Sequence, residues 1–393
     1  MAEAARDACI TGIGIVSSLG EGAEAHWQKL TAGEIKVDET AFAPYPIHPL
    51  VAVEFDKQIP KKGDQRQMEA WQRIGTYAAG LALDDAGLKG NAEILARTDM
   101  IVAAGGGERD IAADGAILTA ITAAEKPART LNDKLMSDIR PTLFLAQLSN
   151  LLAGNISIVH NVTGSSRTFM GEEACGVDAV RIAVARINSG QSDVALVGGS
   201  YNAERKDNLM LYELGHALLK APYKPVWERD GGGFVFGSLG AFLVIESRAH
   251  AEKRGAKVAA KINTVASDRT RSNETASAAL TRLWEPLSSR VNKADAAILS
   301  GATGAGARTQ SEREFLATRD IPVRATGTYI GHGLEPQFPM NIALAALAIR
   351  NGGLFPPRDA SGLEKPAAGK VRQVVVTSVG AVRGEGLALV EAA

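Results

Sequence analysis

The stretch Gly171-Glu-Glu-Ala-Cys-Gly-Val-Asp-Ala-Val180 decides the fold of this chain. A turn cluster, Thr163-Gly-Ser-Ser166, precedes it, and a helical pattern runs from it to Gly190. The apolar run Asp193-Val-Ala-Leu-Val-Gly-Gly199 then predicts a buried strand that ends in glycines. A sharp turn into a helix start places side chains over backbone N–H donors, where anions are stabilised. The stretch is therefore a candidate catalytic helix start, with an acid, Glu173, in its first turn.

Strand-like runs lie on both sides of this stretch. Upstream, the β-branched residues of Asn155-Ile-Ser-Ile-Val159 predict a short strand. Downstream, further runs predict strands at residues 233–246, 297–302, 374–380 and 386–391. In several of them an apolar strand ends in small residues, and helix-like sequence follows. This repetition indicates duplication of one β/α unit, with two layers packed face to face.

The repeat predicts two halves, residues 1–250 and 256–393, joined by the charged stretch Ser247–Ala256. Active-site residues are expected at their junction, where strand ends converge. The least regular region is 105–150. Within it we expect a helix over Ala112–Ala124, polar turns over Leu131–Arg140 and an apolar helix over Leu143–Leu152.

Composition narrows the class of protein. The 393 residues are 46% hydrophobic and include 41 glycines, which suits a large α/β core with tight turns. A net charge of −1 argues against a nucleic-acid surface. Two cysteines cannot build a disulfide framework, and metal-ligand spacing is absent, so no metal or other cofactor is expected. No signal peptide or membrane-spanning run is evident, which predicts a soluble, cytoplasmic protein without a membrane span.

Residues 163–199 resemble the nucleophile region of β-ketoacyl-acyl carrier protein synthases, the condensing enzymes of fatty-acid and polyketide synthesis, with a KAS II-like pattern. Further motifs in family order are Thr11–Gly20, Lys224-Pro225, Arg229-Asp230-Gly231, Gly233–Gly237, Gly331-His332-Gly333 and Thr377–Gly386. The resemblance covers nearly the whole chain. It implies an α/β thiolase-like fold of two pseudo-symmetric halves with a five-layered α-β-α-β-α core. It also implies that the region 105–150 contributes to a substrate tunnel and a dimer contact.

The same resemblance assigns the site residue by residue. Glu173 falls at the nucleophilic cysteine, Gly301 at the first catalytic histidine and Gly327 at the catalytic lysine, whereas His332 retains the second histidine. The pocket for the acyl group and oxyanion would be formed by Gly171, Cys175, Val379, Gly380 and Ala381. Val379 and Ala381 stand where the family has the phenylalanines of its C-terminal gate.

The residues leave several roles open for Glu173 and Cys175. Glu173 could attack a thioester, although the mixed anhydride formed is much less stable than a thioester. Alternatively, Glu173 could be a fixed charge at a helix N-terminus that resembles a thiolate without turnover. Cys175 could be the nucleophile. It lies two residues after Glu173, however, and two helical residues correspond to a rotation of about 200°, so its thiol is expected to point away from the side of the helix that carries Glu173. His332 is expected to line the site and hydrogen-bond a carbonyl or Glu173.

Other titratable residues are expected to have structural or solvent-exposed roles. Arg229 and Asp230 are expected to anchor a loop. Glu312 and Glu314 are expected to be solvated at a helix start. The remaining histidines are expected at the surface or at strand ends, and they are His26, His48, His160, His216 and His250.

Three functions fit these observations. The first is a non-condensing relative of chain-length factors, which binds acyl carrier protein and forms a heterodimer with an active synthase. The second is an active enzyme, either a condensing synthase that uses Cys175 or a malonyl-carrier decarboxylase. The third is a homodimer that binds acyl groups or acyl carrier protein without catalysis.

Overall fold

The computed structural model describes residues 6–271, 274–367 and 369–393. The strands are β1 Ala8–Ser17, β2 Gly20–Glu21, β3 Asp99–Ala104, β4 Ser166–Met170, β5 Val194–Tyr201, β6 Leu239–Ser247, β7 Ala260–Asp268, β8 Ala296–Ser300, β9 Val323–Ala325, β10 Gln373–Val379 and β11 Glu385–Glu391. The helices before β5 are α1 Gly22–Ala32, α2 Lys62–Gln67, α3 Ala70–Asp85, α4 Ala92–Leu95, α5 Ile111–Thr122, α6 Pro127–Ser137, α7 Thr142–Ala146, α8 Leu151–His160 and α9 Glu173–Asn188. The later helices are α10 Lys206–Leu214, α11 Arg248–Lys253, α12 Ala276–Ser288, α13 Gly306–Ala317, α14 Gly327–Ile330 and α15 Gln337–Arg350.

The strands follow one topology twice. The sheet order is β4-β3-β5-β6-β1-β7-β11-β10-β8-β9, with β2 paired to β1. On one side of the centre, β4, β3 and β5 are parallel, and β6 and β1 continue antiparallel. On the other side, β9, β8 and β10 are parallel, and β11 and β7 continue antiparallel. The division into residues 1–250 and 256–393 stays a prediction, because chain topology does not fix where a linker begins.

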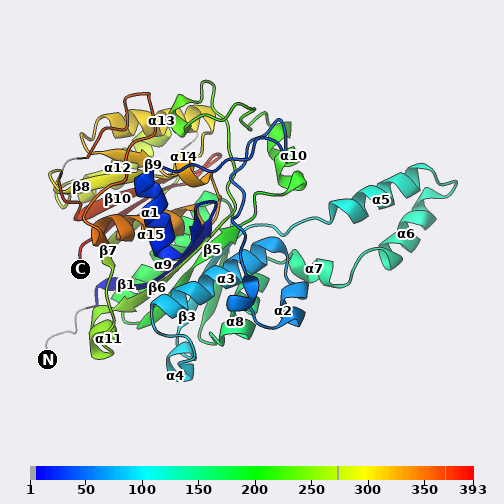
Figure 1. The fold of residues 1–393 in the computed structure, drawn as a ribbon, viewed down its shortest axis with the longest axis horizontal. Coiled ribbons are helices and arrows are strands. Elements are labelled where there is room, and N and C mark those ends of the chain that lie inside the picture. The colour runs from blue at the N-terminus through cyan, green and yellow to red at the C-terminus, as the bar shows by residue number, and fades with distance from the viewer. Residues whose placement is uncertain (1–5, 272–273, 368) are drawn as a thin grey trace.

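Helices cover both outer faces and fill the middle. In Figure 1, α12 and α13 lie above the body, α9 and α15 run through its centre, and α3 and α8 lie below. The α3 helix packs on β1, β5 and β6, whereas α12 packs on β7 and β11. The α9 and α15 helices contact strands of both groups. The resulting layers are α-β-α-β-α, as the sequence predicts.

The composition of α15 follows from its central place. Residues 337–349 of this helix are all buried, and the apolar ones occur on every side of the helix. A helix that is apolar all round is stable only when protein surrounds it. The α9 helix has a narrower buried stripe, and it includes Val177, Val180 and Val184. These two helices therefore form the inner layer against which both strand groups bury their apolar faces.

Several predicted elements were wrong. Residues 155–159 belong to helix α8, not to a strand, because Leu152, Ala153 and Ile156 repeat at helical spacing and pack beside α3. The strand of this region is β4, a half-exposed edge strand with no strong apolar alternation. In residues 233–246 only β6 is a strand, whereas Phe234 and Phe236 form isolated bridges.

Two further segments also differ from the sequence expectation. The predicted turns at 131–140 lie largely in α6, which Pro127 starts at a favourable position. The expected helix 143–152 is broken, because α7 ends at Ala146 and α8 begins at Leu151. The charged stretch 247–256 contains α11, whose first turn is capped when Ser247 Oγ accepts from the backbone N–H of His250.

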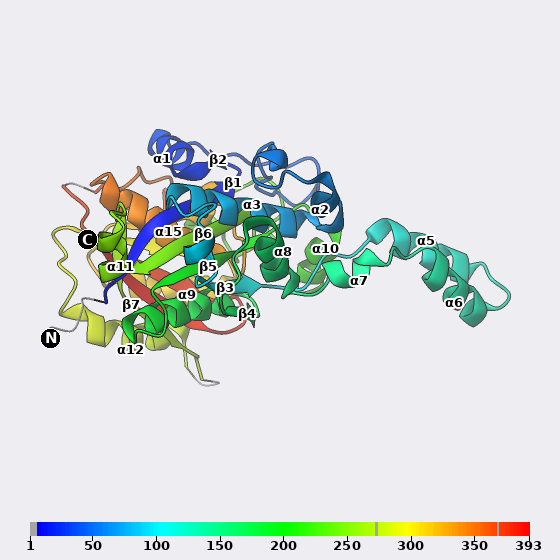
Figure 2. The ribbon, with the colours of Figure 1, turned by 90° about the horizontal axis from the view of Figure 1, so that it is seen from below.

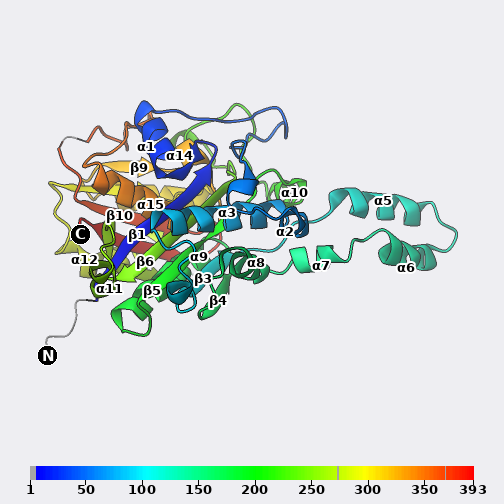
Figure 3. The same cartoon turned by 60° about the horizontal axis from the view of Figure 1, so that its bottom comes forward.

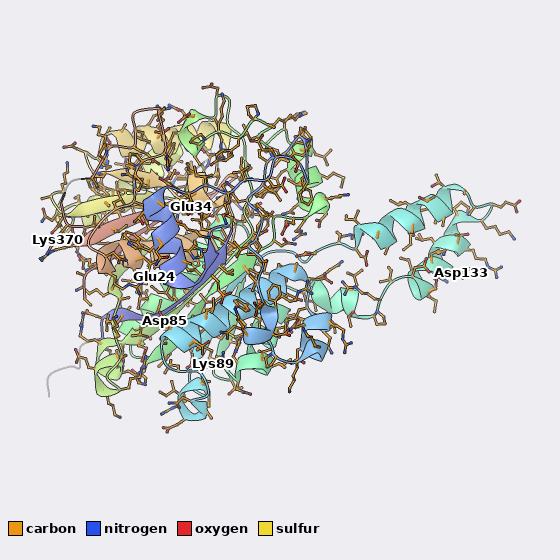
Figure 4. All side chains as sticks on the ribbon, in the orientation of Figure 1. Glu24, Glu34, Asp85, Lys89, Asp133 and Lys370 are labelled. Carbon is orange, nitrogen blue, oxygen red and sulfur yellow. The ribbon has the colours of Figure 1, made fainter. Side chains whose placement is uncertain are left out.

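Helices α5, α6 and α7 project from the body as an arm (Figures 1, 2 and 3). Figure 4 places the side chain of Asp133 near the far end of this arm. Large apolar side chains are exposed along it, and among them Met136 is 81% exposed and Phe144 is 69% exposed. Among the described residues, no helix has the length and apolar character needed to cross a membrane.

Candidate active site at the start of α9

The carboxylate of Glu173 lies at the first turn of α9. This residue is only 2% exposed, although glutamate is rarely buried without a partner. The positive end of the helix dipole stabilises a carboxylate at this position by about 0.3–1 kcal/mol. The site therefore holds an acid at the place where a strand–turn–helix unit concentrates N–H donors.

His332 reaches Glu173 from the other strand group. Its backbone is fixed beside the segment 234–237, since its N–H donates to Val235 O at 2.9 Å and its C=O accepts from Gly237 N at 3.1 Å. The imidazole Nε2 lies 3.0 Å from Glu173 Oε1, and both side chains are 2% exposed. Phe234 packs on the imidazole with ring centroids 5.6 Å apart. Nε2–H thus donates to the carboxylate inside the core.

The second oxygen of Glu173 faces the segment after β10. Among the described residues, Glu173 Oε2 and His332 Nδ1 have no hydrogen-bond partner. A Cβ built on Gly380 would lie 3.2 Å from Glu173 Oε2, so the backbone there approaches the carboxylate closely. Gly380 N donates to Gly384 O at 2.8 Å, and Arg308 Nε donates to Gly380 O at 3.0 Å. The segment is therefore held over the acid by both of its backbone polar groups.

The residues on either side of Gly380 complete this cover. Val379 ends β10 and is 1% exposed in the core beneath α12 and α13. Ala381 is half-buried and packs on the cluster that contains Phe234, Phe236 and Leu334. Two small apolar residues thus flank the glycine that faces Glu173.

Gly301 follows β8 and has little room for a side chain. A Cβ built there would lie 2.9 Å from Thr377 O and 3.2 Å from Asn341 Nδ2. Real Cβ atoms essentially never approach a backbone oxygen so closely, so β10 would have to move. The nearby Asn341 belongs to a buried amide network, because Thr326 Oγ1 donates to its Oδ1 at 2.7 Å and Gln337 Nε2 donates to Thr326 Oγ1 at 3.1 Å.

Gly327 begins α14 and is buried as well. A Cβ there would lie 3.3 Å from both Ala302 O and Val226 Cγ2. These contacts are tighter than usual, so a longer side chain requires neighbours to shift by a few tenths of an ångström. The nearest neighbours of a Cβ at Gly301 or Gly327 do not include Glu173. The structure therefore brings Glu173, His332 and Gly380 together, whereas these two glycines face other residues.

Cys175 lies on the same helix start but turns its thiol elsewhere. Its Sγ donates to Glu172 O at 3.0 Å and to Gly171 O at 3.3 Å. Burial, helped by the carboxylates of Glu335 and Glu173, raises the pKa of this thiol well above its usual value. A thiolate is the reactive form of cysteine, so this environment opposes nucleophilic attack.

Sequence reasoning missed Glu335. This residue is 5% exposed and lies three residues beyond His332. Burial raises its pKa to about 8, and the Glu173 carboxylate adds to the shift. The only sequence signal was an acid within a mostly apolar segment, Gly333–Met340, whose one other polar residue is Gln337.

The expectation for Glu312 was wrong, whereas Glu314 is exposed. Glu312 lies inside α13 with 0% exposure, where its Oε1 accepts from Ser300 Oγ at 2.7 Å and Thr377 Oγ1 at 2.6 Å. Burial raises its pKa. Hydrogen bonds from two strand ends thus replace solvent around this acid.

Three of the histidines expected at the surface are buried, namely His26, His48 and His160. Burial lowers the pKa of His26 to about 4, of His48 to about 3 and of His160 to about 4. His216 is exposed, and His250 pairs with the buried Glu246. Arg229 is buried and donates to Lys224 O and Gly233 O at 2.9 Å each, which fits the expected loop anchor.

Several known proteins are similar to this chain in sequence or in fold. The sequence profile described as "Beta-ketoacyl synthase, N-terminal domain" matches residues 5–251. The 3-oxoacyl-[acyl-carrier-protein] synthase 2 of Vibrio cholerae is 26% identical over 268 residues, which cover 65% of this chain and 62% of the Vibrio protein. The chain thus spans less than two thirds of that relative.

Two further matches extend along almost the whole chain. The tetracenomycin polyketide synthase ketoacyl synthase beta subunit of Streptomyces glaucescens is 26% identical over 381 residues, covering 92% of this chain and 89% of that protein. The solved ishigamide ketosynthase/chain length factor superposes with a TM-score of 0.81 at 21% identity, covering 99% of this chain and 100% of the other. The latter establishes a thiolase-like fold. Because the profile match spans more than half of the 393 residues, the chain belongs to the beta-ketoacyl synthase family.

Proposed function

We propose that this protein is a non-condensing member of its family that binds acyl carrier protein and pairs with an active synthase in fatty-acid or long acyl chain synthesis. The observation that carries the proposal is the buried hydrogen bond from His332 Nε2 to Glu173 Oε1 at 3.0 Å. In a condensing enzyme, an imidazole N–H here would stabilise the enolate formed from malonyl. In this protein, that donor is already engaged by a carboxylate of the chain itself.

The chemistry of Glu173 supports the same proposal. Acyl transfer between thiols is nearly isoenergetic, whereas a carboxylate that attacks a thioester forms a much less stable mixed anhydride. Glu173 is also held between His332 and the Gly380 backbone, which limits the approach of a thioester carbonyl. A fixed negative charge at this point resembles a thiolate in charge but not in nucleophilicity.

The neighbouring glycines argue against a residual decarboxylase. The resemblance places the first histidine at Gly301 and the lysine at Gly327, and neither glycine offers a proton donor from a side chain. At Gly301 the carbonyl of Thr377 and the amide of Asn341 occupy the space that a side chain would need. A malonyl-carrier decarboxylase of this family needs two imidazole donors, so His332 alone is insufficient.

Cys175 is a weak basis for an active synthase. Its thiol is 4% exposed, donates to backbone carbonyls and has a raised pKa. Condensation through this residue would require the first turn of α9 to unwind. The alternative of an active enzyme therefore has no observation in its favour beyond family membership.

The arm formed by α5, α6 and α7 supports a partner subunit. Its exposed apolar side chains are Ile111, Leu118, Leu131, Leu135, Met136, Phe144 and Leu145. Monomeric proteins rarely expose so many large apolar residues in one region, because their hydration is unfavourable. We infer that a second subunit covers this arm. A relative named as a beta subunit and a solved ketosynthase/chain length factor favour a different chain over a second copy.

The decisive experiment is co-expression with a family member that keeps the intact cysteine and both histidines. Light scattering after size-exclusion chromatography gives the subunit composition, and malonyl- and acyl-carrier substrates report condensation by each protein and by the mixture. We expect a heterodimer, with condensation only when the active synthase is present. Condensation by this chain alone would refute the proposal, and a homodimer that ignores the synthase would favour a non-catalytic binding protein.

Substitution of Cys175 supplies the matched control. Cys175→Ala in this chain should leave condensation by the heterodimer unchanged, as should Cys9→Ala at the other buried thiol. Alanine in place of the catalytic cysteine of the partner synthase should abolish it. Loss of activity with Cys175→Ala, but not with Cys9→Ala, would assign the chemistry to this chain.

A further inference from the structure

A cavity of about 220 Å³ lies beside the start of α9. Its walls include the aromatic residues Trp71, Tyr201 and Tyr212 and the acids Glu172 and Glu335. Glu173 lies next to this cavity in sequence but does not line it. The cavity is therefore separate from the Glu173–His332 pair, although the two share one helix start.

The carboxylate of Glu335 is the most unusual group in the cavity wall. The residue is 5% exposed, and among the described residues its carboxyl group has a backbone N–H donor, its own, but no side-chain donor or ion pair. A Cβ built on Gly105 would lie 2.2 Å from Glu335 Oε1, so the acid rests directly on a glycine backbone. A buried carboxyl group with so few donors is costly to ionise unless a ligand supplies more.

The positive charge in the wall does not compensate this acid. Arg205 Nε donates to Asp207 Oδ1 at 3.0 Å, and Nη2 donates to Asp207 Oδ2 at 2.5 Å. Its Nη2 also donates to Gly107 O at 3.0 Å. Because Arg205 is already paired with Asp207, the acids Glu172 and Glu335 have no cationic partner in the cavity wall.

The aromatic walls indicate which kind of cation fits. Aromatic faces attract ammonium groups, and the attraction grows when both partners are removed from water. A metal ion is a poorer fit, because among the described residues no group of three or more His, Cys, Asp or Glu side chains could hold one. An apolar acyl chain would leave the Glu335 carboxylate without a partner.

We propose that this cavity binds a small organic ammonium ion, with Glu335 accepting its N–H donors and the aromatic rings enclosing its alkyl part. The inference goes beyond the proposed function and does not depend on it. Its test reads binding rather than condensation, so the two can fail separately.

Isothermal titration calorimetry on the purified full chain tests the proposal with n-butylammonium chloride as the probe. Sodium butyrate and 1-butanol have the same carbon chain length without a cationic head. We expect n-butylammonium to bind about tenfold or more tightly than either. Equal binding of the three compounds, or no binding of n-butylammonium, would overturn the proposal.

Substitution of Glu335 locates the site. Glu335→Gln keeps the shape and removes the carboxyl group that can give up its proton to a bound cation, and it should weaken binding of n-butylammonium by about tenfold or more. Glu364→Gln is the matched control, since Glu364 is another buried glutamate whose pKa is raised, to about 7, but it contacts the backbone of Ala325 instead. Unchanged affinity in Glu335→Gln, or an equal loss in both variants, would overturn the assignment.

Proton release gives a readout that does not require any variant to fold. Glu335 holds its proton up to about pH 8, so binding of a cation near neutral pH should release a proton. The apparent binding enthalpy should then differ between phosphate and HEPES buffers, which differ in their enthalpy of ionisation and contain no primary ammonium group. The other charged or titratable groups facing Glu335 are Glu172, Glu173, Cys175, Arg205, Tyr201 and Tyr212. Binding without proton release would overturn the role of Glu335.

Discussion

Glu173 and His332 lie 159 residues apart in sequence, yet their side chains meet at 3.0 Å in the core. Glu173 starts α9, which packs between the two strand groups, and His332 follows α14 of the second group. The contact therefore joins the two groups of strands through one buried hydrogen bond.

Removal of His332 should destabilise the fold. His332→Ala leaves the Glu173 carboxylate buried without its donor, and breaking such a pair costs about 3–5 kcal/mol. Urea denaturation followed by circular dichroism measures the change. His216→Asn is the control, because this residue is exposed and its φ of 51° suits asparagine. A loss below about 1 kcal/mol for His332→Ala would mean that water replaces the donor.

Restoring the thiol alone should not restore condensation. Glu173→Cys supplies a nucleophile, but under the proposed alignment Gly301 and Gly327 still lack the histidine and lysine side chains expected at those positions. Adding Gly301→His should destabilise the fold by about 1–3 kcal/mol, because its Cβ would lie 2.9 Å from Thr377 O. Product analysis with acyl and malonyl carriers tests the first statement, and thermal denaturation tests the second. Product formed by Glu173→Cys alone would contradict our interpretation of both glycines.

Thiol labelling should be slow in the folded protein. Cys9 and Cys175 are both buried, and burial raises the pKa of each. An aromatic disulfide reagent near pH 8 should therefore react quickly with both thiols only after denaturation, when thiolate and access are restored. An exposed Ser289→Cys variant provides the positive control for labelling. Rapid reaction of one native thiol, lost in Cys175→Ala, would favour a catalytic cysteine.

Acid should destabilise the protein through its buried neutral histidines. His26 Nδ1 donates to Gly22 O at 2.7 Å, its Nε2 accepts from Ser17 Oγ at 2.8 Å, and burial lowers its pKa to about 4. As pH falls below about 6.5, the unfolded chain binds a proton that the folded chain refuses. Stability is then lost at about 1.4 kcal/mol per pH unit until folded His26 protonates near pH 4. His26→Gln should remove this component, and urea denaturation at several pH values measures it. A constant difference between wild type and variant would contradict the burial argument.

Charges on the arm should prevent pairing without unfolding the chain. Leu118 is 60% exposed and Phe144 is 69% exposed, so aspartate at either position should change the free energy of unfolding by no more than about 0.5 kcal/mol. The same substitutions should strongly weaken the proposed heterodimer, because a partner would have to bury the new charges. Light scattering measures the assembly. Ser289→Asp, just after α12, adds the same charge away from the arm and should leave pairing intact.

Much of the fold was predictable because buried strands appear in the sequence as short, continuous runs of apolar residues. Runs such as 374–380 and 386–391 lie close to β10 and β11, since both faces of these strands are covered and every position can be apolar. The region 155–170 was not predictable in this way. Its β-branched run, residues 155–159, lies in helix α8, and its true strand, β4, is half-exposed. Tertiary packing against α3 overrides the local preference there.

The candidate site was predictable only through the order of family motifs. No periodicity in the sequence predicts the contact between Glu173 and His332, because it depends on how the start of α9 and the segment after α14 meet in the fold. Glu335 was missed since an isolated acid is normally solvated, and its burial follows from the backbone of Gly105 lying against it. Likewise, the lack of space at Gly301 arises from Thr377 and Asn341, which approach it from β10 and α15.

The shared inner layer has a consequence for how this protein denatures. The α9 helix packs on β7 and β11 as well as on β3 and β5, and α15 packs on β6 as well as on β10. Neither strand group therefore has a complete hydrophobic core of its own. Cleaving the chain between α11 and β7 would give two fragments that each expose one face of those helices. Calorimetry should therefore record a single cooperative heat-absorption peak, and the severed fragments should regain structure only when mixed.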